Sequence, residues 1–139
     1  MFLKTANPLV IRTDFENQKA WDVICGLIRA PVQEGSDTFF AFVEFLEVAE
    51  YRNISTDELL QTLPPDYNHT FLFIVDGACI SNPEFPILVV DLYESRGRSF
   101  RAIPSQIQSI ENNLSIANMD FEEFADSVDK DGIFRGFPG

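Results

Sequence analysis

Residues 70–92 read TFLFIVDGACISNPEFPILVVDL, with two apolar runs on either side of a short polar connection. The runs FLFIV and ILVV are rich in Val, Ile and Phe, and neither alternates between apolar and polar residues. Continuous runs of this kind are typical of strands that pack on both faces. The stretch therefore predicts two buried strands, which end at Asp76 and Asp91.

The segments at the start of the chain add a strand and a helix. LVIRT at residues 9–13 is a short β-type run. From Glu16 to Ala30 apolar residues recur every three or four positions, which predicts an amphipathic helix. We expect Asp14 to cap this helix and Pro31 to end it.

The segment TFFAFVEFLE at residues 38–47 is apolar on both faces of an extended chain. We therefore expect a central strand that is covered on both sides. Ser55 and Glu58 then form a Ser-x-x-Glu capping box, which predicts a short helix over residues 56–63 before Pro64.

The C-terminal third predicts one more strand and two helices. RSFRAI at residues 98–103 is more polar and follows a turn, as is typical of an edge strand. Ser105 with Gln108, and Asp120 with Glu123, form two further capping boxes. Each is followed by an apolar stripe at helical spacing, so both helices should dock on the core.

The predicted elements occur in the order β-α-β-α-β-β-β-α-α. This order favours an α/β or α+β fold, a mixed sheet of four to five strands with helices on its faces. The 139 residues match the size of one domain, and no Gly/Ser-rich or Pro-rich segment divides them. We expect a single globular domain over residues 1–139.

The charge is strongly unbalanced, with ten Lys and Arg against 22 Asp and Glu and a formal net charge of -12. Such a surface repels nucleic acid and anionic membranes, so neither is an expected partner. It would favour a basic protein partner or divalent cations, although an acidic surface that only solubilises the chain is the more common role of such charge.

Cysteine usage and apolar run lengths indicate a cytoplasmic protein. Cys25 and Cys79 each lie in an apolar context, where a free thiol behaves as a small hydrophobe. The N-terminus has no apolar h-region of a signal peptide, and no apolar run approaches a membrane span.

The aspartates that end three predicted strands form one candidate site. Asp14, Asp76 and Asp91 would converge at one edge of the sheet if these strands were parallel neighbours. Clustered carboxylates hold Mg²⁺ with phosphate, which would suit a phosphoryl-transfer enzyme or a phosphoacceptor domain. The favoured interpretation is that each aspartate caps or turns the chain at a strand end, and the metal site is the alternative.

A second candidate is calcium binding near the C-terminus. Asp129 and Asp131 would take positions 3 and 5 of an EF-hand loop with Gly132 at position 6. Ser127 and Pro138 stand where that loop needs an aspartate and a bidentate glutamate. A helix C-terminus turned by Gly132 is therefore the favoured interpretation, and metal binding is the alternative.

The arginines in ESRGRSFR form the third candidate. Arg96, Arg98 and Arg101 could hold a carboxylate or a phosphate bidentately. Ion pairs within the chain are the favoured interpretation, and anion binding is the alternative. The available acids include Glu122, Glu123, Asp126 and Asp129.

Four segments carry a resemblance to a known family. They are TDFENQKAW, FLFIVD, ILVVDL and, most specifically, ENNLSIANMDFEEFADSVDKDGIFRGF. The chain resembles an uncharacterised bacterial family of single-domain proteins of about this length, over nearly everything from Leu9 to Phe137. The resemblance implies a bacterial, cytoplasmic origin and assigns no activity or functional residue.

A second, shorter resemblance lies in LLQTLPPDYNHTFLFIVDG at residues 59–77. It is similar to the Leu-Pro-x-x-Tyr segment that opens the immunity-protein superfamily related to a yeast cell-wall regulator.

The sequence thus favours a non-enzymatic acidic domain that binds another protein, as an inhibitor or immunity-type partner of something basic. Glu44, Glu47 and Glu50 form the predicted contact surface, and solvation is their alternative role. This interpretation needs no cofactor. The competing interpretation is the Mg²⁺-dependent enzyme, so enzymatic activity stays open, and the sequence does not indicate an oligomeric state.

Overall fold

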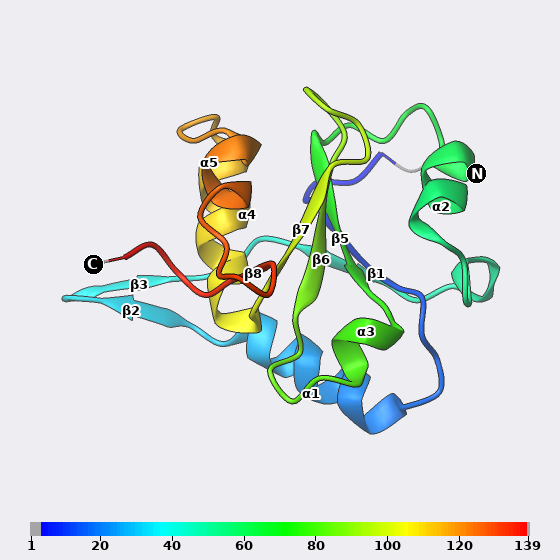
Figure 1. Cartoon of the computed structure of the whole chain (residues 1–139), viewed down its shortest axis with the longest axis horizontal. Helices are drawn as coiled ribbons and strands as arrows, with labels where there is room; N and C mark the ends of the chain where they lie inside the picture. The colour runs from blue at the N-terminus through cyan, green and yellow to red at the C-terminus, as the bar shows by residue number, and fades with distance from the viewer. Residues whose placement is uncertain (1–3, 139) are drawn as a thin grey trace.

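Six strands form one mixed sheet in the order β4-β1-β5-β6-β7-β8 in the computed structural model, which describes residues 4–138 (Figure 1). Strand β6 is antiparallel to both of its neighbours, whereas β4, β1 and β5 are mutually parallel and β8 is parallel to β7. The C-terminal end of β6 therefore lies at the same end of the sheet as the N-terminal ends of β1 and β5. The strands are β1 (Leu9–Arg12), β4 (Glu44–Leu46), β5 (Phe71–Val75), β6 (Ile87–Asp91), β7 (Ser99–Ala102) and β8 (Ile133–Phe134).

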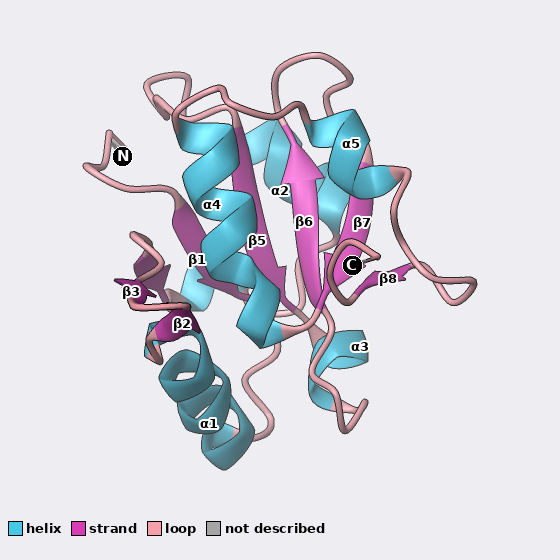
Figure 2. Ribbon diagram, turned by 90° about the vertical axis from the view of Figure 1, so that its left-hand side faces the viewer, coloured by secondary structure: helices cyan, strands magenta, loops and turns pink. Residues whose placement is uncertain are grey.

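Helices cover both faces of this sheet (Figure 2). One face packs against α1 (Gln18–Arg29), α4 (Ile107–Ser115) and α5 (Phe121–Ala125). The other packs against α2 (Thr56–Thr62) and the 3-10 helix Ala49–Tyr51. The predicted α/β fold is thus confirmed, with more strands than the sequence indicated. Two short helices remain, α3 (Gly77–Ile80) after β5 and the 3-10 turn Pro104–Gln106 before α4.

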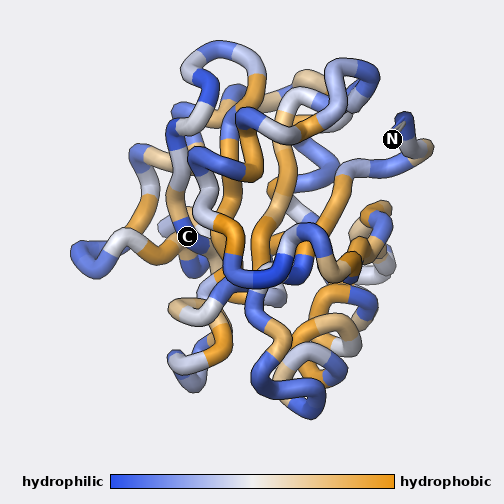
Figure 3. Tube along the Cα trace, turned by 90° about the vertical axis from the view of Figure 1, so that its right-hand side faces the viewer, coloured by the Kyte–Doolittle hydropathy of each residue, from blue (hydrophilic) through white to orange (hydrophobic). Residues whose placement is uncertain are grey.

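The central strands are buried on both faces, as their continuous apolar runs predict. Phe71 and Phe73 of β5 face α4, whereas Leu72 and Ile74 face α2. Adjacent strand residues point to opposite faces, so every position of β5 contributes to one of two apolar layers. Figure 3 accordingly shows the central strands largely in the orange of apolar residues. Truncating such a phenylalanine typically costs about 3–5 kcal/mol of stability.

The predicted central strand at residues 38–47 is wrong. This segment divides into β3 (Asp37–Phe39), which pairs with β2 (Val32–Glu34) in a separate two-stranded hairpin, and β4, which is the edge strand of the main sheet. Phe40 and Phe42 lie between them and are exposed. An apolar run alone does not distinguish a strand that is covered on both faces from a chain that leaves the sheet.

One predicted capping box is complete, one is formed only on the side of its serine, and two predicted caps are replaced. The Ser55 side chain accepts from the Glu58 backbone N–H, and Glu123 accepts from the backbone N–H of Asp120. Helix α1 is capped by Asn17 in place of Asp14, because the Asn17 side chain reaches the Ala20 N–H. The residue predicted to cap α4, Ser105, lies in the 3-10 turn that precedes this helix.

Strand β7 is not at the edge of the sheet, because β8 pairs with it. β8 has two residues and follows Gly132, whose φ of 82° turns the chain back toward the sheet. So short a run carries no periodic signal, which is why the sequence did not predict it. None of the helices within residues 4–138 combines the length and apolar character that crossing a membrane requires.

Candidate functional site

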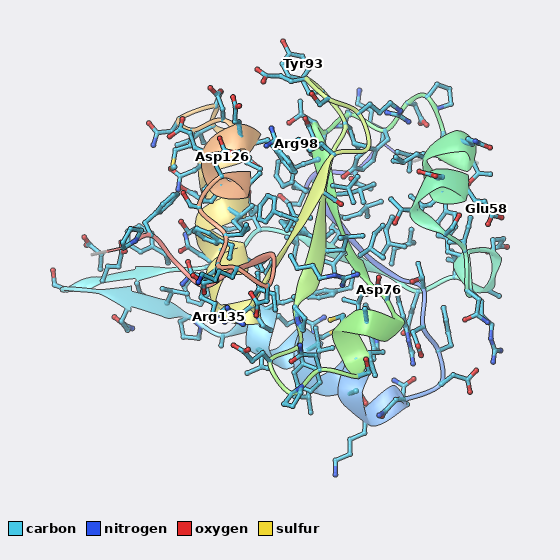
Figure 4. The ribbon with its side chains drawn as sticks, viewed as in Figure 1. Glu58, Asp76, Tyr93, Arg98, Asp126 and Arg135 are labelled. Atoms are coloured by element: carbon cyan, nitrogen blue, oxygen red, sulfur yellow. The ribbon has the colours of Figure 1, made fainter. Side chains whose placement is uncertain are left out.

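The sheet order separates the three strand-end aspartates. Asp91 ends β6 opposite Phe71, the first residue of β5, whereas Asp76 follows the last residue of that strand. Figure 4 accordingly shows Asp76 and Tyr93, two residues beyond Asp91, at opposite ends of the sheet. The convergence that parallel strands would have produced does not occur, because β6 runs antiparallel to β5.

Asp14 and Asp76 lie at the same end of the sheet, just after the parallel strands β1 and β5. Both side chains make hydrogen bonds within the chain. The Asp76 carboxylate accepts from both terminal nitrogens of Arg101, at 2.9 and 2.8 Å, and from the Cys79 N–H. Asp14 accepts from the backbone N–H of Glu16. Among residues 4–138, no three His, Cys, Asp or Glu side chains are grouped so as to hold a metal ion.

The pKa of Asp76 lies below its ordinary value. Burial opposes ionisation of this carboxyl group, but the Arg101 hydrogen bonds, the Arg101 charge and the Cys79 N–H together outweigh burial. Burial has the opposite result at the two cysteines. It raises the pKa of Cys25 to about 11 and that of Cys79 to about 12, so both thiols stay protonated at neutral pH.

The arginines of ESRGRSFR point to three separate partners. Arg98, labelled with Asp126 in Figure 4, forms an ion pair with this aspartate at 3.2 Å, and Arg101 pairs with Asp76. Arg96 donates to the backbone carbonyl of Leu60. These side chains therefore join distant segments of the chain and do not form one anion-binding patch.

Asp129 and Asp131 surround an arginine. Arg135 lies 2.7 Å from Asp129 and 2.6 Å from Asp131, and it also contacts Glu84. The guanidinium pairs with these carboxylates and offsets part of their negative charge, and the labelled Arg135 marks this position in Figure 4. The hydrogen bonds with Arg135 hold the pKa of Asp131 below its ordinary value, although partial desolvation opposes this.

The three glutamates of the predicted contact surface have unequal surroundings. Glu44 accepts from the backbone N–H of Asn7 at 2.8 Å, and Glu47 pairs with the buried Arg12 at 3.1 Å. Glu50 is exposed in the 3-10 helix. Two of the three carboxylates thus already support the fold.

A groove of about 770 Å³ lies at the other end of the sheet, where strands β1 and β5 begin and β6 ends. Its lining includes α4 with the turn that leads to α5, and also Asp91 with the loop that follows it. Tyr67 joins the two strand starts at this end, because its hydroxyl accepts from the Leu9 N–H and donates to the Phe71 carbonyl. Pockets of this size are typical of ligand sites.

Carboxylates are the charged groups of this groove. Asp91, Glu94, Glu111 and Asp120 line it, and none of the described lining residues is Lys or Arg. Asp91 is 4% exposed and Glu111 is 3% exposed, which makes them the two buried carboxylates among residues 4–138. The groove therefore concentrates negative charge within a low-dielectric wall.

Large apolar side chains stand at the rim of the same groove. Phe42, Tyr93 and Ile116 are 58%, 74% and 65% exposed, and each of them lines it. Tyr93 points outward from the loop between β6 and β7 in Figure 4. Exposed apolar side chains that gather beside a groove are typical of a binding site.

A family model matches residues 7–137, nearly the whole chain. The chain belongs to this family, DUF6924, a domain of unknown function. The resemblance to an uncharacterised single-domain family is thereby confirmed. Comparison with curated proteins and with solved structures gave no match.

The groove of this DUF6924 domain was not predicted from the sequence, because it combines segments that are far apart in the chain. One signal was available: Glu111 follows Ile110 on the apolar stripe of the helix predicted after Ser105. A charged residue on a face that docks on the core needs hydrogen-bond partners there. Glu111 finds them in the Phe42 N–H and the Ser115 hydroxyl.

Proposed function

We propose that this domain is a non-enzymatic binding module and that its groove holds a segment of a basic protein. The observation that carries the proposal is the composition of the groove, which joins four carboxylates to three exposed apolar side chains and contains no described Lys or Arg. A cationic segment with apolar side chains complements both features.

The charge of the whole chain supports the same kind of partner. A net charge of -12 attracts a basic protein over a distance and increases the rate of productive encounters, an effect that salt weakens. The apolar rim would then contribute short-range affinity. An inhibitor or immunity-type role, in which the domain covers a functional surface of a basic protein, is compatible with this chemistry.

The groove is a better contact surface than Glu44, Glu47 and Glu50. Arg12 already engages Glu47 in an ion pair, so a basic partner would compete with a charge pair that supports the fold. The carboxylates of the groove have no cationic partner among residues 4–138. A basic segment would supply one.

We also place this domain in the bacterial cytoplasm, without a cofactor. Cys25 and Cys79 are both free and buried, which suits a reducing compartment. Binding through the groove requires no metal ion.

Affinity purification from a native host extract tests the proposal. The tagged domain should retain one stoichiometric basic protein, and the purified pair should bind more weakly as salt is raised. The double variant Tyr93→Ala and Glu94→Gln should lose the partner, since both exposed residues line the groove.

Glu50→Gln is the matched control, because it removes one exposed negative charge outside the groove. It should retain the partner. A partner that the Glu50 variant loses and the groove variant keeps would move the contact surface to the sequence-predicted glutamates. A partner that is acidic, or that binds independently of salt, would contradict the proposed function.

A further inference from the structure

We infer that the groove recognises an arginine side chain of an extended segment, which Asp91 and Glu111 hold while Tyr93 and Phe42 flank it. This inference rests on the proposed function and specifies the chemistry of its partner. It follows from four observations on the same groove: the burial of two carboxylates, their unused hydrogen-bond capacity, the aromatic residues beside them and the size of the groove.

The first observation is that both buried carboxylates lack a counterion. Asp91 and Glu111 are 4% and 3% exposed, and neither forms an ion pair with any residue of 4–138. Arg12, the buried cation, pairs with Glu47 instead. Buried charged groups in proteins are usually paired, so a cation from outside the chain would complete this arrangement.

The second observation is that each carboxylate has unused acceptor capacity. The two oxygens of Asp91 each accept one backbone N–H, from Tyr93 at 3.0 Å and from Ser95 at 2.9 Å. The oxygens of Glu111 accept from the Phe42 N–H at 2.8 Å and from the Ser115 hydroxyl at 2.7 Å. An ionised carboxylate has about four acceptor sites, so about half of the sites on each remain for a ligand.

The third observation is that the same hydrogen bonds position aromatic side chains. Asp91 holds the backbone of Tyr93, and Glu111 holds the backbone of Phe42, and both rings line the groove and are exposed. An aromatic face attracts a cation, and a guanidinium stacks on it while its N–H groups reach a carboxylate. Carboxylates with adjacent exposed rings therefore suit arginine better than lysine, whose ammonium is a more strongly hydrated point charge.

The fourth observation is the size of the groove. A volume of about 770 Å³ is far larger than one guanidinium requires, and Ile116 and Leu114 provide apolar surface beside the carboxylates. The neighbouring residues of an extended segment would occupy this space. A free small cation would leave it unfilled, so the inference commits to a peptide segment of a protein partner.

Fluorescence anisotropy with a defined probe tests the inference. The probe is a labelled, end-capped peptide of four Arg-Leu repeats, and its control contains citrulline, a neutral isostere, in place of each arginine. The domain should bind the citrulline peptide roughly tenfold or more weakly than the arginine peptide, because a charge-assisted hydrogen bond to a carboxylate is lost. Equal binding of the two peptides would overturn the inference.

Substitutions locate the binding site. Asp91→Asn and Glu111→Gln should each weaken binding of the arginine peptide by roughly thirtyfold, the low end for breaking a desolvated charge pair. Asp37→Asn is the matched control, since it removes one exposed charge on the β2–β3 hairpin outside the groove, and roughly twofold weakening is expected there. If the groove variants weaken binding no more than Asp37→Asn, Asp91 and Glu111 do not recognise the cation.

Tyr93→Leu provides a readout that does not depend on the buried carboxylates, because Tyr93 is largely exposed and its substitution leaves the core intact. This variant should weaken the arginine peptide by roughly fivefold and leave the citrulline peptide unchanged, as expected for loss of a cation–π contact. If Asp91→Asn and Glu111→Gln do not fold, the Tyr93→Leu variant tests the inference alone. Unchanged binding of the arginine peptide by this variant would then contradict it.

Two further outcomes separate this inference from the proposed function. Spermine that displaces the peptide as effectively as an unlabelled arginine peptide would identify a free polyamine as the occupant and overturn the commitment to a protein segment. A native basic partner that Tyr93→Ala with Glu94→Gln releases, but that binds Asp91→Asn and Glu111→Gln normally, would leave the proposed function standing and refute arginine recognition.

Discussion

Asp76 stays ionised in a half-buried position because three N–H groups point at its carboxylate. Two belong to Arg101 of β7 and one to the backbone of Cys79, so this side chain links the end of β5 to the neighbouring part of the sheet and caps α3. Arg101 also donates to the Pro86 carbonyl just before β6. The residue that the sequence marked as a candidate metal ligand therefore has a structural role.

Asp76→Asn should lower the free energy of unfolding by about 2 kcal/mol at neutral pH, since Arg101 loses its charged partner. The folded-state pKa of Asp76 lies below its ordinary value of 3.8, so its contribution is complete above that pH and is lost as the pH falls below it. Urea unfolding of both proteins between neutral and acidic pH should show a difference that shrinks in acid.

Asp126→Asn is the matched control, because its ion pair with Arg98 is largely exposed and should contribute less than about 0.5 kcal/mol. A difference between wild type and Asp76→Asn that stayed constant down to acidic pH would contradict the assignment.

The hydroxyl group of Tyr67 joins the first residues of β1 and β5 beside the groove. Tyr67→Phe would leave the Leu9 N–H and the Phe71 carbonyl without this partner, and should cost about 1–2 kcal/mol of stability. Tyr93→Phe removes the same atom from an exposed ring and should be neutral. Thermal melts of the two variants compare them, and equal melting temperatures would argue against the contacts of Tyr67.

Helix caps were partly predictable, because they depend on residues three positions apart. Ser55 acts as predicted, whereas Ser105 lies in a 3-10 turn and makes no cap hydrogen bond to α4. Ser55→Ala should therefore cost about 1 kcal/mol, and Ser105→Ala should stay within about 0.5 kcal/mol of wild type. Denaturant unfolding of the two variants measures both values, and the reverse order would show that Ser105 is the stronger cap.

The apolar segment at residues 38–47 shows why composition alone did not predict the position of a strand. A buried strand and an exposed connection can have the same composition, and only the pairing of β2 with β3 places Phe40 outside the core. Phe40→Ala should cost less than about 1 kcal/mol, whereas Phe73→Ala at the centre of β5 should cost about 3–5 kcal/mol. Comparable losses of stability for the two variants in chemical denaturation would indicate that Phe40 lies in a buried central strand, as the sequence predicted.

At the scale of the whole molecule, the sequence predicted the two buried central strands but not how the sheet is ordered. The runs at β5 and β6 predict two strands packed on both faces, and both are found. Their antiparallel pairing depends on long-range contacts that leave no periodic signal. Because of this pairing, Asp91 lies at the opposite end of β5 from Asp76 and lines the groove, as Glu111 does.

The net charge of the chain could likewise be predicted from the sequence, but the positions of the unpaired carboxylates in the fold could not. The excess of carboxylates is evident from composition, but many of them are engaged by arginines, as Asp129 and Asp131 are by Arg135. The groove differs because its acids face apolar side chains and have no cationic partner among residues 4–138. The basic partner that we propose therefore rests on composition, and the binding site that we propose for it rests on the fold.

The most direct test of the account is an NMR titration of the ¹⁵N-labelled domain with the arginine peptide. The backbone amides of Phe42, Tyr93 and Ser95 donate to Glu111 and Asp91, so they report directly on any cation that reaches these carboxylates. We predict saturable shifts concentrated at these three amides and along residues 111–121. Shifts confined to residues 44–50, or spread evenly over all acidic segments, would contradict a binding site in the groove.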